Sequence, residues 1–236
     1  MSCSHFSPIA TENLLDVDKY ENDCKVFAKW TKNHIRKIHL MGGEPLLHIN
    51  VDKIMEITRK NFPKSTIKLV TNGILLDRMD SKFWNSCKIN NIIISITYYP
   101  ININVKRISE LAAQYGIHVE SFKRDLNLNF RKDVLDARGS QNINEMYKKC
   151  NPVCHQLHEG KLYICRVPAY VKYINQYFSK EFVVSENDYI DIYKIKDKKT
   201  ILNYLKNPIP FCRYCKLDVS ERIEWCLSKK EESEWF

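Results

Sequence analysis

The sequence predicts an α/β fold over residues 1–149, followed by a small cysteine-rich α+β domain over residues 150–236. Short apolar runs alternate with amphipathic segments in the first part, and the connections between them are short. This alternation is typical of parallel strands joined by right-handed crossover helices. The composition then changes, because six of the nine cysteines follow residue 149. An open barrel and a doubly wound sheet both fit the first part, and both place ligands at the carboxyl ends of the strands.

Four helices are expected where apolar residues recur every three or four positions. The first carries Cys24 on its apolar face, which explains this cysteine as a small buried residue. Asn50 is expected to cap the second helix and Pro63 to end it, and Gly116 is expected to stop the fourth. The expected helices are 17–33, 51–61, 81–87 and 105–115.

Four strands are expected to alternate with these helices. The run from Asn91 to Tyr98 is almost continuously apolar, which indicates burial on both faces, as in a parallel sheet. Residues 124–149 are polar and irregular, and we expect a connector there. A hairpin arm is expected at Gly160–Cys165, and a short helix near Thr200–Leu205. The expected strands of the sheet are 35–41, 66–70, 91–98 and 117–123.

The first of these strands ends in Gly42-Gly43-Glu44-Pro45. Two adjacent glycines allow backbone dihedrals that are closed to other residues, and they leave the main-chain carbonyls uncovered. Glu44 adds a carboxylate, and Pro45 stiffens the chain as it leaves the strand. The result would be an acceptor-rich ledge that suits an ammonium group. A plain strand-to-helix turn with a chance glutamate fits the same four residues.

Two further polar segments follow neighbouring strands. Thr71-Asn72-Gly73 ends the second strand, and Ser95–Tyr98 ends the third. Because the carboxyl ends of parallel strands meet at one edge of a sheet, these segments and the ledge predict a ligand site at that rim.

The charge and the apolar pattern restrict the class of protein. The formal net charge is +9, but lysines are scattered through every segment, so a lysine-rich surface explains the charge better than nucleic-acid binding does. No apolar run approaches the roughly 18 residues that suggest a membrane span. The N-terminus lacks a basic region followed by an apolar one, as a secretory signal would have, so we expect a cytoplasmic location.

The late cysteines have the spacing of a metal site. Cys212-x-x-Cys215 places two sulfurs on one turn, and Cys165 could supply a third ligand from the hairpin. Cys150 or Cys154 could supply the fourth. Four thiolates suit either zinc or an iron–sulfur cluster, and a bound metal would help to hold this part of the chain.

Two alternatives stay open for these cysteines. They could be buried thiols that bind no metal. Cys226 is left over from the expected set, and it is either another ligand or a core residue.

The ledge and the N-terminus together resemble the radical S-adenosylmethionine (SAM) enzymes. Gly42-Gly43-Glu44-Pro45 follows a strand, and Cys3-Ser-His-Phe-Ser-Pro lies upstream, as in one branch of that family. The resemblance implies a partial (β/α)6 barrel that lacks its first strand here. It also implies reduction of SAM by a 4Fe–4S cluster, to give a 5′-deoxyadenosyl radical that takes hydrogen from a substrate.

The second half resembles the SPASM or twitch extension of the same enzymes, which carries auxiliary iron–sulfur clusters. That extension has a cysteine, about nine or more residues, and then Gly-x4-Cys, which Cys150, Gly160 and Cys165 match. Cys212-x-x-Cys215 resembles its later pair, so the likeness covers nearly the whole chain.

The resemblance assigns roles to individual residues. Gly42, Gly43 and Glu44 would hold the SAM amino group, Ser95 would face the ribose, and Lys123 or Arg124 could meet the SAM carboxylate. The expected cofactor-binding residues are Gly42, Gly43, Glu44, Pro45, Asn72 and Ser95. The expected metal ligands are Cys3, Cys150, Cys154, Cys165, Cys212 and Cys215.

One departure from the family is large. The family cluster needs Cys-x3-Cys-x2-Cys, and Cys3 fits only the third of these; the first two would precede Met1. We therefore expect either a truncated version of an active enzyme, which we favour, or a decayed relative.

The predicted function is that of a radical SAM enzyme with an unknown peptide, sugar or small-metabolite substrate. It would use an electron donor such as a flavodoxin or ferredoxin. The alternative is a non-catalytic scaffold, stabilised by zinc or a cluster, that binds a partner.

Overall fold

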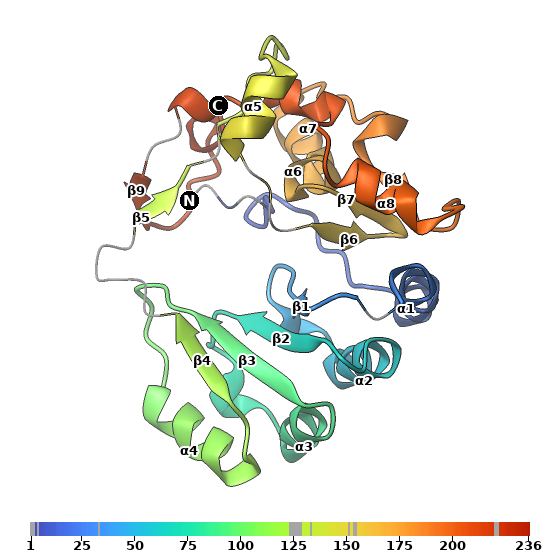
Figure 1. Ribbon diagram of the computed structural model, residues 1–236. Coiled ribbons are helices and arrows are strands. Elements are labelled where there is room, and N and C mark those ends of the chain that lie inside the picture. Colours follow the sequence, from blue (N-terminus) through green and yellow to red (C-terminus); the bar gives the residue numbers. More distant parts are fainter. Residues whose placement is uncertain are drawn as a thin grey trace. The chain divides into compact units, whose positions relative to one another are not determined.

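The computed structural model describes residues 3–236 apart from residues 4, 33, 123–128, 133, 151, 153–154 and 220–221. It divides into two compact units: Figure 1 colours one from blue to green, and the other from yellow-green to red together with the dark-blue N-terminal segment. We name them the sheet unit, Asn13–Asn127, and the cysteine unit, Met1–Glu12 with Leu128–Phe236.

The sheet unit contains a four-stranded sheet in which all strands are parallel and lie in the order β1-β2-β3-β4. The strands are β1 (Lys37–Leu40), β2 (Thr66–Thr71), β3 (Ile92–Thr97) and β4 (Val119–Phe122). The helices are α1 (Val17–Thr31), α2 (Val51–Asn61), α3 (Ser81–Ile89) and α4 (Val105–Tyr115). Two 3-10 turns, η1 (Pro45–Leu47) and η2 (Leu76–Arg78), follow β1 and β2. The predicted α/β fold with a parallel sheet is confirmed.

The helices of this unit pack on one face of the sheet. Ile67 and Leu69 of β2 and Ile94 of β3 are fully buried against apolar residues of α2, α3 and α4. Side chains alternate between the two faces of a strand, so Lys68 and Ser95 lie on the opposite face. A doubly wound sheet carries helices on both faces, whereas the described helices of this unit lie on one face only.

The predicted helix and strand bounds in this unit differ from the structure by a few residues. The first helix ends at Thr31 rather than residue 33, because Lys32 takes a left-handed conformation with φ 47°. Gly116 stops α4 with φ 69°, as expected. Asn50 precedes α2, but its side chain makes no capping hydrogen bond there.

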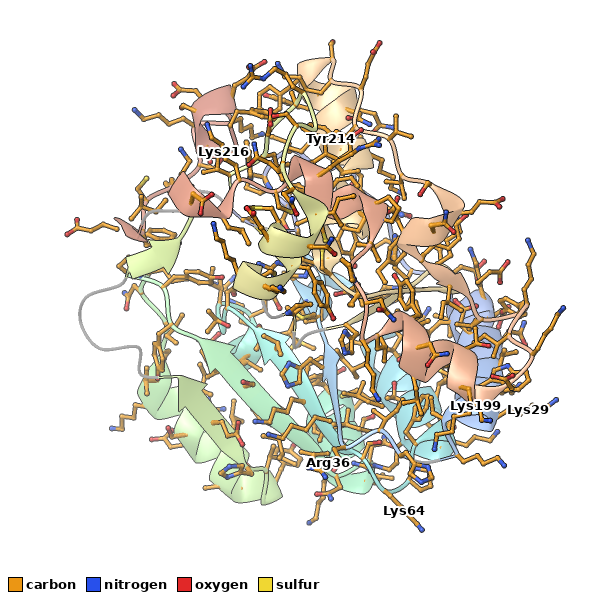
Figure 2. The ribbon with its side chains drawn as sticks, turned by 45° about the horizontal axis from the view of Figure 1, so that its top comes forward. Lys29, Arg36, Lys64, Lys199, Tyr214 and Lys216 are labelled. Carbon is orange, nitrogen blue, oxygen red and sulfur yellow. The ribbon has the colours of Figure 1, made fainter. Side chains whose placement is uncertain are left out.

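The basic side chains of the sheet unit are dispersed. Lys29, Arg36 and Lys64, labelled in Figure 2, are exposed and belong to three different segments, which agrees with a solvated surface. Among the residues that the structure describes, no helix has both the length and the apolar character needed to cross a membrane.

The cysteine unit is built from short elements. Its helices are α5 (Ile143–Cys150), α6 (Arg166–Tyr170), α7 (Lys172–Phe178) and α8 (Lys198–Tyr204). Its strands are β5 (Asn129–Arg131), β6 (Gln156–His158), β7 (Lys161–Tyr163), β8 (Ile190–Asp191) and β9 (Arg222–Glu224). Its 3-10 turns are η3 (Glu186–Asp188), η4 (Pro210–Tyr214), η5 (Leu217–Val219) and η6 (Glu232–Glu234).

Two expectations about this unit can be compared with the structure. The expected hairpin is present: β6 and β7 are antiparallel, and Glu159 and Gly160, with φ 50° and 75°, form the two-residue turn between them. The connector expected at residues 124–149 was wrong in part, because it contains β5 and α5. α5 has eight residues, fewer than the roughly 11 over which helical periodicity is recognised in a sequence, and only its Met146 is buried.

The N-terminal segment belongs to the cysteine unit because it packs into that unit's core. Phe6 is 2% exposed and lies edge-on to Trp235, which is 1% exposed. Leu135 joins the same core and pairs with Cys215 in an isolated bridge. The two units therefore do not coincide with the ranges 1–149 and 150–236 that the composition suggests.

Candidate cofactor site and cysteine cluster

Glu44 is fixed at the carboxyl ends of β1 and β2. Its Oε1 accepts hydrogen bonds from the backbone N–H of Leu46 (3.1 Å) and from the hydroxyl of Thr71 (2.7 Å). Its Oε2 accepts one from the backbone N–H of Asn72 (3.0 Å). A carboxylate offers about four lone-pair sites, so Oε2 keeps one for a further donor. Hydrogen bonds therefore hold the Glu44 carboxylate at the carboxyl ends of the strands, and one of its oxygens can still accept a hydrogen bond from a ligand.

The two glycines of the ledge leave space rather than adopt unusual dihedrals. Neither Gly42 nor Gly43 has a positive φ, so the left-handed dihedrals that glycines allow are not used at these two positions. Both are exposed, and a Cβ at either position would have no atom within 4 Å. A ligand can therefore approach the main chain here. In contrast, Gly73 has φ 84°, and a Cβ there would be 3.2 Å from Ile96.

At the end of β2, the atoms that contact Glu44 are a threonine hydroxyl and a backbone N–H rather than the Asn72 side chain. The side-chain oxygen of Asn72 accepts a hydrogen bond from the backbone N–H of Ile74 (2.8 Å), and only its own backbone N–H reaches Glu44. Thr71, which belongs to the predicted rim segment but not to the expected cofactor-binding residues, supplies the side-chain contact with Glu44 and is 2% exposed. The signal for Thr71 was its position as the last residue of a strand beside the ledge.

Ser95 has a buried hydroxyl. It lies in the third of four described strands, is 0% exposed, and its Oγ has no hydrogen-bond partner within the described residues. An unsatisfied buried polar group costs roughly 1–3 kcal/mol. A ligand hydroxyl on this face of the sheet would satisfy it. Register places Ser95 beside Val70 and Glu120, and Glu120 forms an ion pair with Lys68 on the same face.

These observations fit the SAM groups that the resemblance implies. Glu44 has a remaining acceptor for an ammonium group, Gly42 and Gly43 leave room beside it, and Ser95 could meet a ribose hydroxyl. Lys123 and Arg124 lie outside the described residues.

Four of the predicted metal ligands line one small cavity in the cysteine unit. Cys150 is the last residue of α5, Cys165 precedes α6, Cys212 lies in η4, and Cys215 follows it. The other lining residues are Met146, Tyr147, Pro152, Ile164 and Ile209. The cavity is therefore apolar apart from its thiols.

The thiols of the cavity are close enough to influence one another. Burial raises the pKa of Cys165 to about 12, and the nearby Cys150 and Cys212 contribute to the increase. Burial also raises the pKa of Cys212, again with a contribution from Cys150. These thiols are protonated at neutral pH, so a bound metal would have to displace their protons.

The four thiols suit zinc or an iron–sulfur cluster by their chemistry, although their side chains are not arranged around a common metal position. Within the described parts of the chain, no three His, Cys, Asp or Glu side chains are arranged so that they could hold a metal ion. Four thiols around one apolar cavity nevertheless fit both groups by their chemistry. Cys154 lies outside the described residues, and Cys226 is exposed and does not line the cavity.

Cys3 also belongs to the cysteine unit but does not line this cavity. Its backbone oxygen accepts a hydrogen bond from Trp235 Nε1 (3.2 Å), and its Sγ lies 3.6 Å from the Ser7 hydroxyl. Burial acts to raise the pKa of Cys3, but hydrogen bonds with His5 and Ser7 outweigh it and lower this pKa to about 6. Cys3 is therefore largely a thiolate at neutral pH, which is the form that binds metals.

Comparison with known proteins gives two likenesses. No protein-family model matches the sequence. A stretch of 54 residues is 43% identical to the GTP 3',8-cyclase of Chlorobaculum tepidum, and it covers 23% of this chain and 16% of the cyclase. The structure resembles the crystal structure of BtrN in complex with AdoMet and 2-DOIA, with a TM-score of 0.52 and 16% identity.

The likeness to BtrN covers 91% of this chain and 87% of that one. It therefore includes both units, whereas the likeness to the cyclase is confined to a short segment. Both findings support the resemblance to radical SAM enzymes, and the chain has the fold of BtrN.

Proposed function

We propose that this chain is a radical SAM enzyme. The observation that carries the proposal is the fold likeness to BtrN, a protein crystallised with AdoMet, over 91% of the chain. The 43% identity to a GTP 3',8-cyclase over 54 residues supports the same family. The activities of those two proteins do not identify the substrate of this one.

In this proposal the sheet unit binds SAM. The fixed carboxylate of Glu44 receives the amino group, with the open space at Gly42 and Gly43 beside it. Ser95 bonds a ribose hydroxyl and so loses the cost of its unpaired Oγ. Asn72 orders the rim through its backbone N–H.

The cysteine unit would hold the metal centres. Cys3 is the one matched ligand of the SAM-cleaving 4Fe–4S cluster, and its low pKa favours ligation. An auxiliary 4Fe–4S cluster would take the four cysteines of the cavity, with Cys150 rather than Cys226 as the fourth ligand. The SAM cluster would supply the electron that cleaves SAM, and a flavodoxin or ferredoxin would reduce that cluster.

Anaerobic reconstitution of the full chain with iron and sulfide tests the proposal. We expect about four irons per chain at the auxiliary site, lost in Cys165→Ser and retained in Cys87→Ser. In a version of the chain that carries all three cysteines of Cys-x3-Cys-x2-Cys, with Cys3 as the third, we also expect 5′-deoxyadenosine from SAM under reducing conditions, and Cys3→Ser should abolish it. A reconstituted chain without iron and acid-labile sulfide would contradict the cluster assignments.

A second candidate function is a non-catalytic, metal-stabilised scaffold. It is favoured by one observation, which is that the four thiols around the cavity suit structural zinc as well as they suit a cluster. Stoichiometric zinc without iron after anaerobic purification, together with no cleavage of SAM, would favour this candidate.

A further inference from the structure

The four cysteines of the cavity come from three segments that are distant in the sequence. Cys150 ends α5, Cys165 follows the β6–β7 hairpin, and Cys212 and Cys215 share one turn. If metal binding alone had to order these three segments around one cavity, the loss of chain conformational entropy would weaken metal binding strongly. Hydrogen bonds within the protein that hold these segments together would lower that entropic cost.

The carboxylate of Asp188 holds the segment that carries Cys212. Its Oδ1 accepts a hydrogen bond from the backbone N–H of Phe211 (2.6 Å), the residue that directly precedes Cys212. Its Oδ2 accepts two more, from the backbone N–H (2.7 Å) and the hydroxyl (2.8 Å) of Ser185. Asp188 is 1% exposed, so these bonds are made away from water.

Tyr204 joins the same residue to the segment that carries Cys165. The Tyr204 hydroxyl donates a hydrogen bond to the backbone oxygen of Asp188 (2.7 Å). It accepts one from the backbone N–H of Ile164 (3.1 Å), the residue that directly precedes Cys165. One tyrosine hydroxyl therefore connects the chain beside Cys165 with the chain beside Cys212, through Asp188.

The third segment, α5 with Cys150 at its end, is hydrogen-bonded to the residue that follows α8. The hydroxyl of Tyr147, in α5, donates a hydrogen bond to the backbone oxygen of Leu205 (3.3 Å), which follows Tyr204. Tyr147 lies three residues before Cys150 and lines the cavity. Each of the three cysteine-bearing segments is thus hydrogen-bonded to Asp188 or to the end of α8.

We propose that Asp188 and Tyr204 are positioning residues of the four-cysteine site, which assemble it before a metal binds. This inference rests on the proposed metal centre. Neither residue contacts the metal, and each acts through the residue that precedes a cysteine. Ser185-x-x-Asp188 is typical of the first turn of a helix, so the sequence indicates the hydrogen bonds between Ser185 and Asp188. The sequence does not indicate the hydrogen bond from Phe211 to Asp188.

Cobalt titration of the metal-free full chain, in the absence of oxygen, tests the inference. Co²⁺ alone is the probe, because its absorption bands report tetrahedral thiolate ligation. We expect wild type to bind one ion at the cavity and Cys165→Ser to lose those bands. Tyr204→Phe removes only the hydroxyl, and Asp188→Asn replaces one acceptor oxygen by a donor.

Each of these two variants should weaken Co²⁺ binding by about 10- to 100-fold, as loss of an outer hydrogen-bond partner does in other metal sites. The double variant should lose less than the product of the single losses, because both act on one connected set of bonds. Tyr163→Phe and Asp191→Asn are matched controls, a buried tyrosine in β7 and an aspartate in β8, and should bind as wild type does.

Thermal unfolding of the metal-free variants shows whether each one folds. If Asp188→Asn does not fold, Tyr204→Phe decides. If wild type binds Co²⁺ and the folded variants bind within about threefold of it, well below the loss expected, the positioning role is overturned and the metal centre stands. If wild type shows no thiolate bands, the metal centre itself is rejected and the positioning role with it.

Discussion

Both units use ionic side chains to satisfy the backbone groups of their loops, but the sheet unit uses a guanidinium in addition to the Glu44 carboxylate, whereas the cysteine unit uses buried carboxylates. In the sheet unit, the Arg59 guanidinium donates hydrogen bonds to four backbone oxygens of the loops beside α2 and α3. In the cysteine unit, the buried carboxylates of Asp136, Asp188 and Glu234 accept hydrogen bonds from backbone N–H groups. Loops that lack regular pairing must satisfy their backbone groups in some other way, and a buried ionic side chain can satisfy several at once.

The difference follows from the amount of regular structure in each unit. Long strands and helices satisfy most of the backbone in the sheet unit, so few loop groups are left. The elements of the cysteine unit have two to eight residues, and side chains take a larger share of the backbone bonds. The cysteine unit should therefore be more sensitive to loss of single polar side chains.

The largest expected difference between the units is in thiol reactivity. At pH 7 in the metal-free chain, iodoacetamide should modify Cys3 more than about 100-fold faster than Cys24 or Cys87. Hydrogen bonds with His5 and Ser7 outweigh burial and lower the pKa of Cys3 to about 6. Burial raises the pKa of Cys24 and that of Cys87 to about 12, and both are almost inaccessible. Peptide mapping by mass spectrometry measures the rates.

His5→Ala is the control for the cause of this reactivity. It removes the side-chain hydrogen bond that favours the Cys3 thiolate, so modification of Cys3 should slow and its pH midpoint should rise. Equal rates at Cys3 and Cys87 in wild type would contradict the assignment.

Asp136→Ala should destabilise the cysteine unit by about 3 kcal/mol, because it removes an acceptor of several charge-assisted hydrogen bonds in a buried site. The carboxylate accepts bonds from the hydroxyl of Ser140 (2.6 Å), the amide of Gln141 (2.9 Å) and the backbone N–H of Arg138 (3.0 Å). Urea unfolding, followed by tryptophan fluorescence in a chain whose Trp30 and Trp84 are replaced by phenylalanine, measures the loss in the cysteine unit. Asp218→Ala, at an exposed carboxylate, is the control.

The same carboxylate makes the stability depend on pH. Hydrogen bonds from Ser140 and Gln141 hold the pKa of Asp136 well below its usual range. A lowered folded-state pKa gives stability that is complete above the unfolded pKa of about 4 and declines as the pH falls below it. Asp136→Asn should flatten the acid limb of the unfolding profile. An unchanged acid limb would show that other groups set it.

Arg59→Ala should destabilise the sheet unit by about 2 kcal/mol, since four backbone oxygens lose a charged donor but lie near enough to water to recover part of the loss. The bonded oxygens are those of Pro63, Ser65, Asn90 and Asn91, at 2.7–3.1 Å. Arg59→Lys should recover only part of the stability, because an ammonium cannot reach the same set of acceptors. A loss as large as that of Asp136→Ala would contradict the proposed difference between the units.

The sequence predicted the two units unequally. All eight expected elements of the sheet unit exist, because apolar periods of two and 3.6 residues persist over whole strands and helices. In the cysteine unit the hairpin was predicted from Gly160, but α5 was missed because a helix of eight residues is shorter than the window over which a helical period is recognised. Short elements are defined by tertiary contacts that the local sequence does not record.

In the candidate sites, the motifs that are contiguous in the sequence were predicted, and the contacts that depend on tertiary structure were not. Gly42-Gly43-Glu44-Pro45 and Cys212-x-x-Cys215 are contiguous, so their spacing alone indicated a site. The contact of Thr71 with Glu44 depends on the pairing of β1 with β2, across 27 residues. The choice of Cys150 over Cys226 depends on the position of α5 beside η4. Neither could be predicted from local spacing.

The smallest expected effect compares two glycines with similar backbone angles. Gly139 in the cysteine unit has φ 63°, and Gly116 in the sheet unit has φ 69°. A Cβ at Gly139 would lie 2.7 Å from the Tyr214 ring, labelled in Figure 2, whereas a Cβ at Gly116 would have no atom within 4 Å. Both alanine variants pay about 1 kcal/mol for a left-handed residue, and Gly139→Ala adds about 1 kcal/mol of overpacking.

Urea unfolding of the two alanine variants measures this difference. Tyr214 directly precedes Cys215, so displacement of its ring in Gly139→Ala should also weaken metal binding at the four-cysteine site. Gly116→Ala should leave metal binding unchanged, because its unit contains none of those cysteines. Equal losses of stability in the two variants would mean that backbone conformation alone sets the cost and that the loop at Gly139 moves freely away from Tyr214.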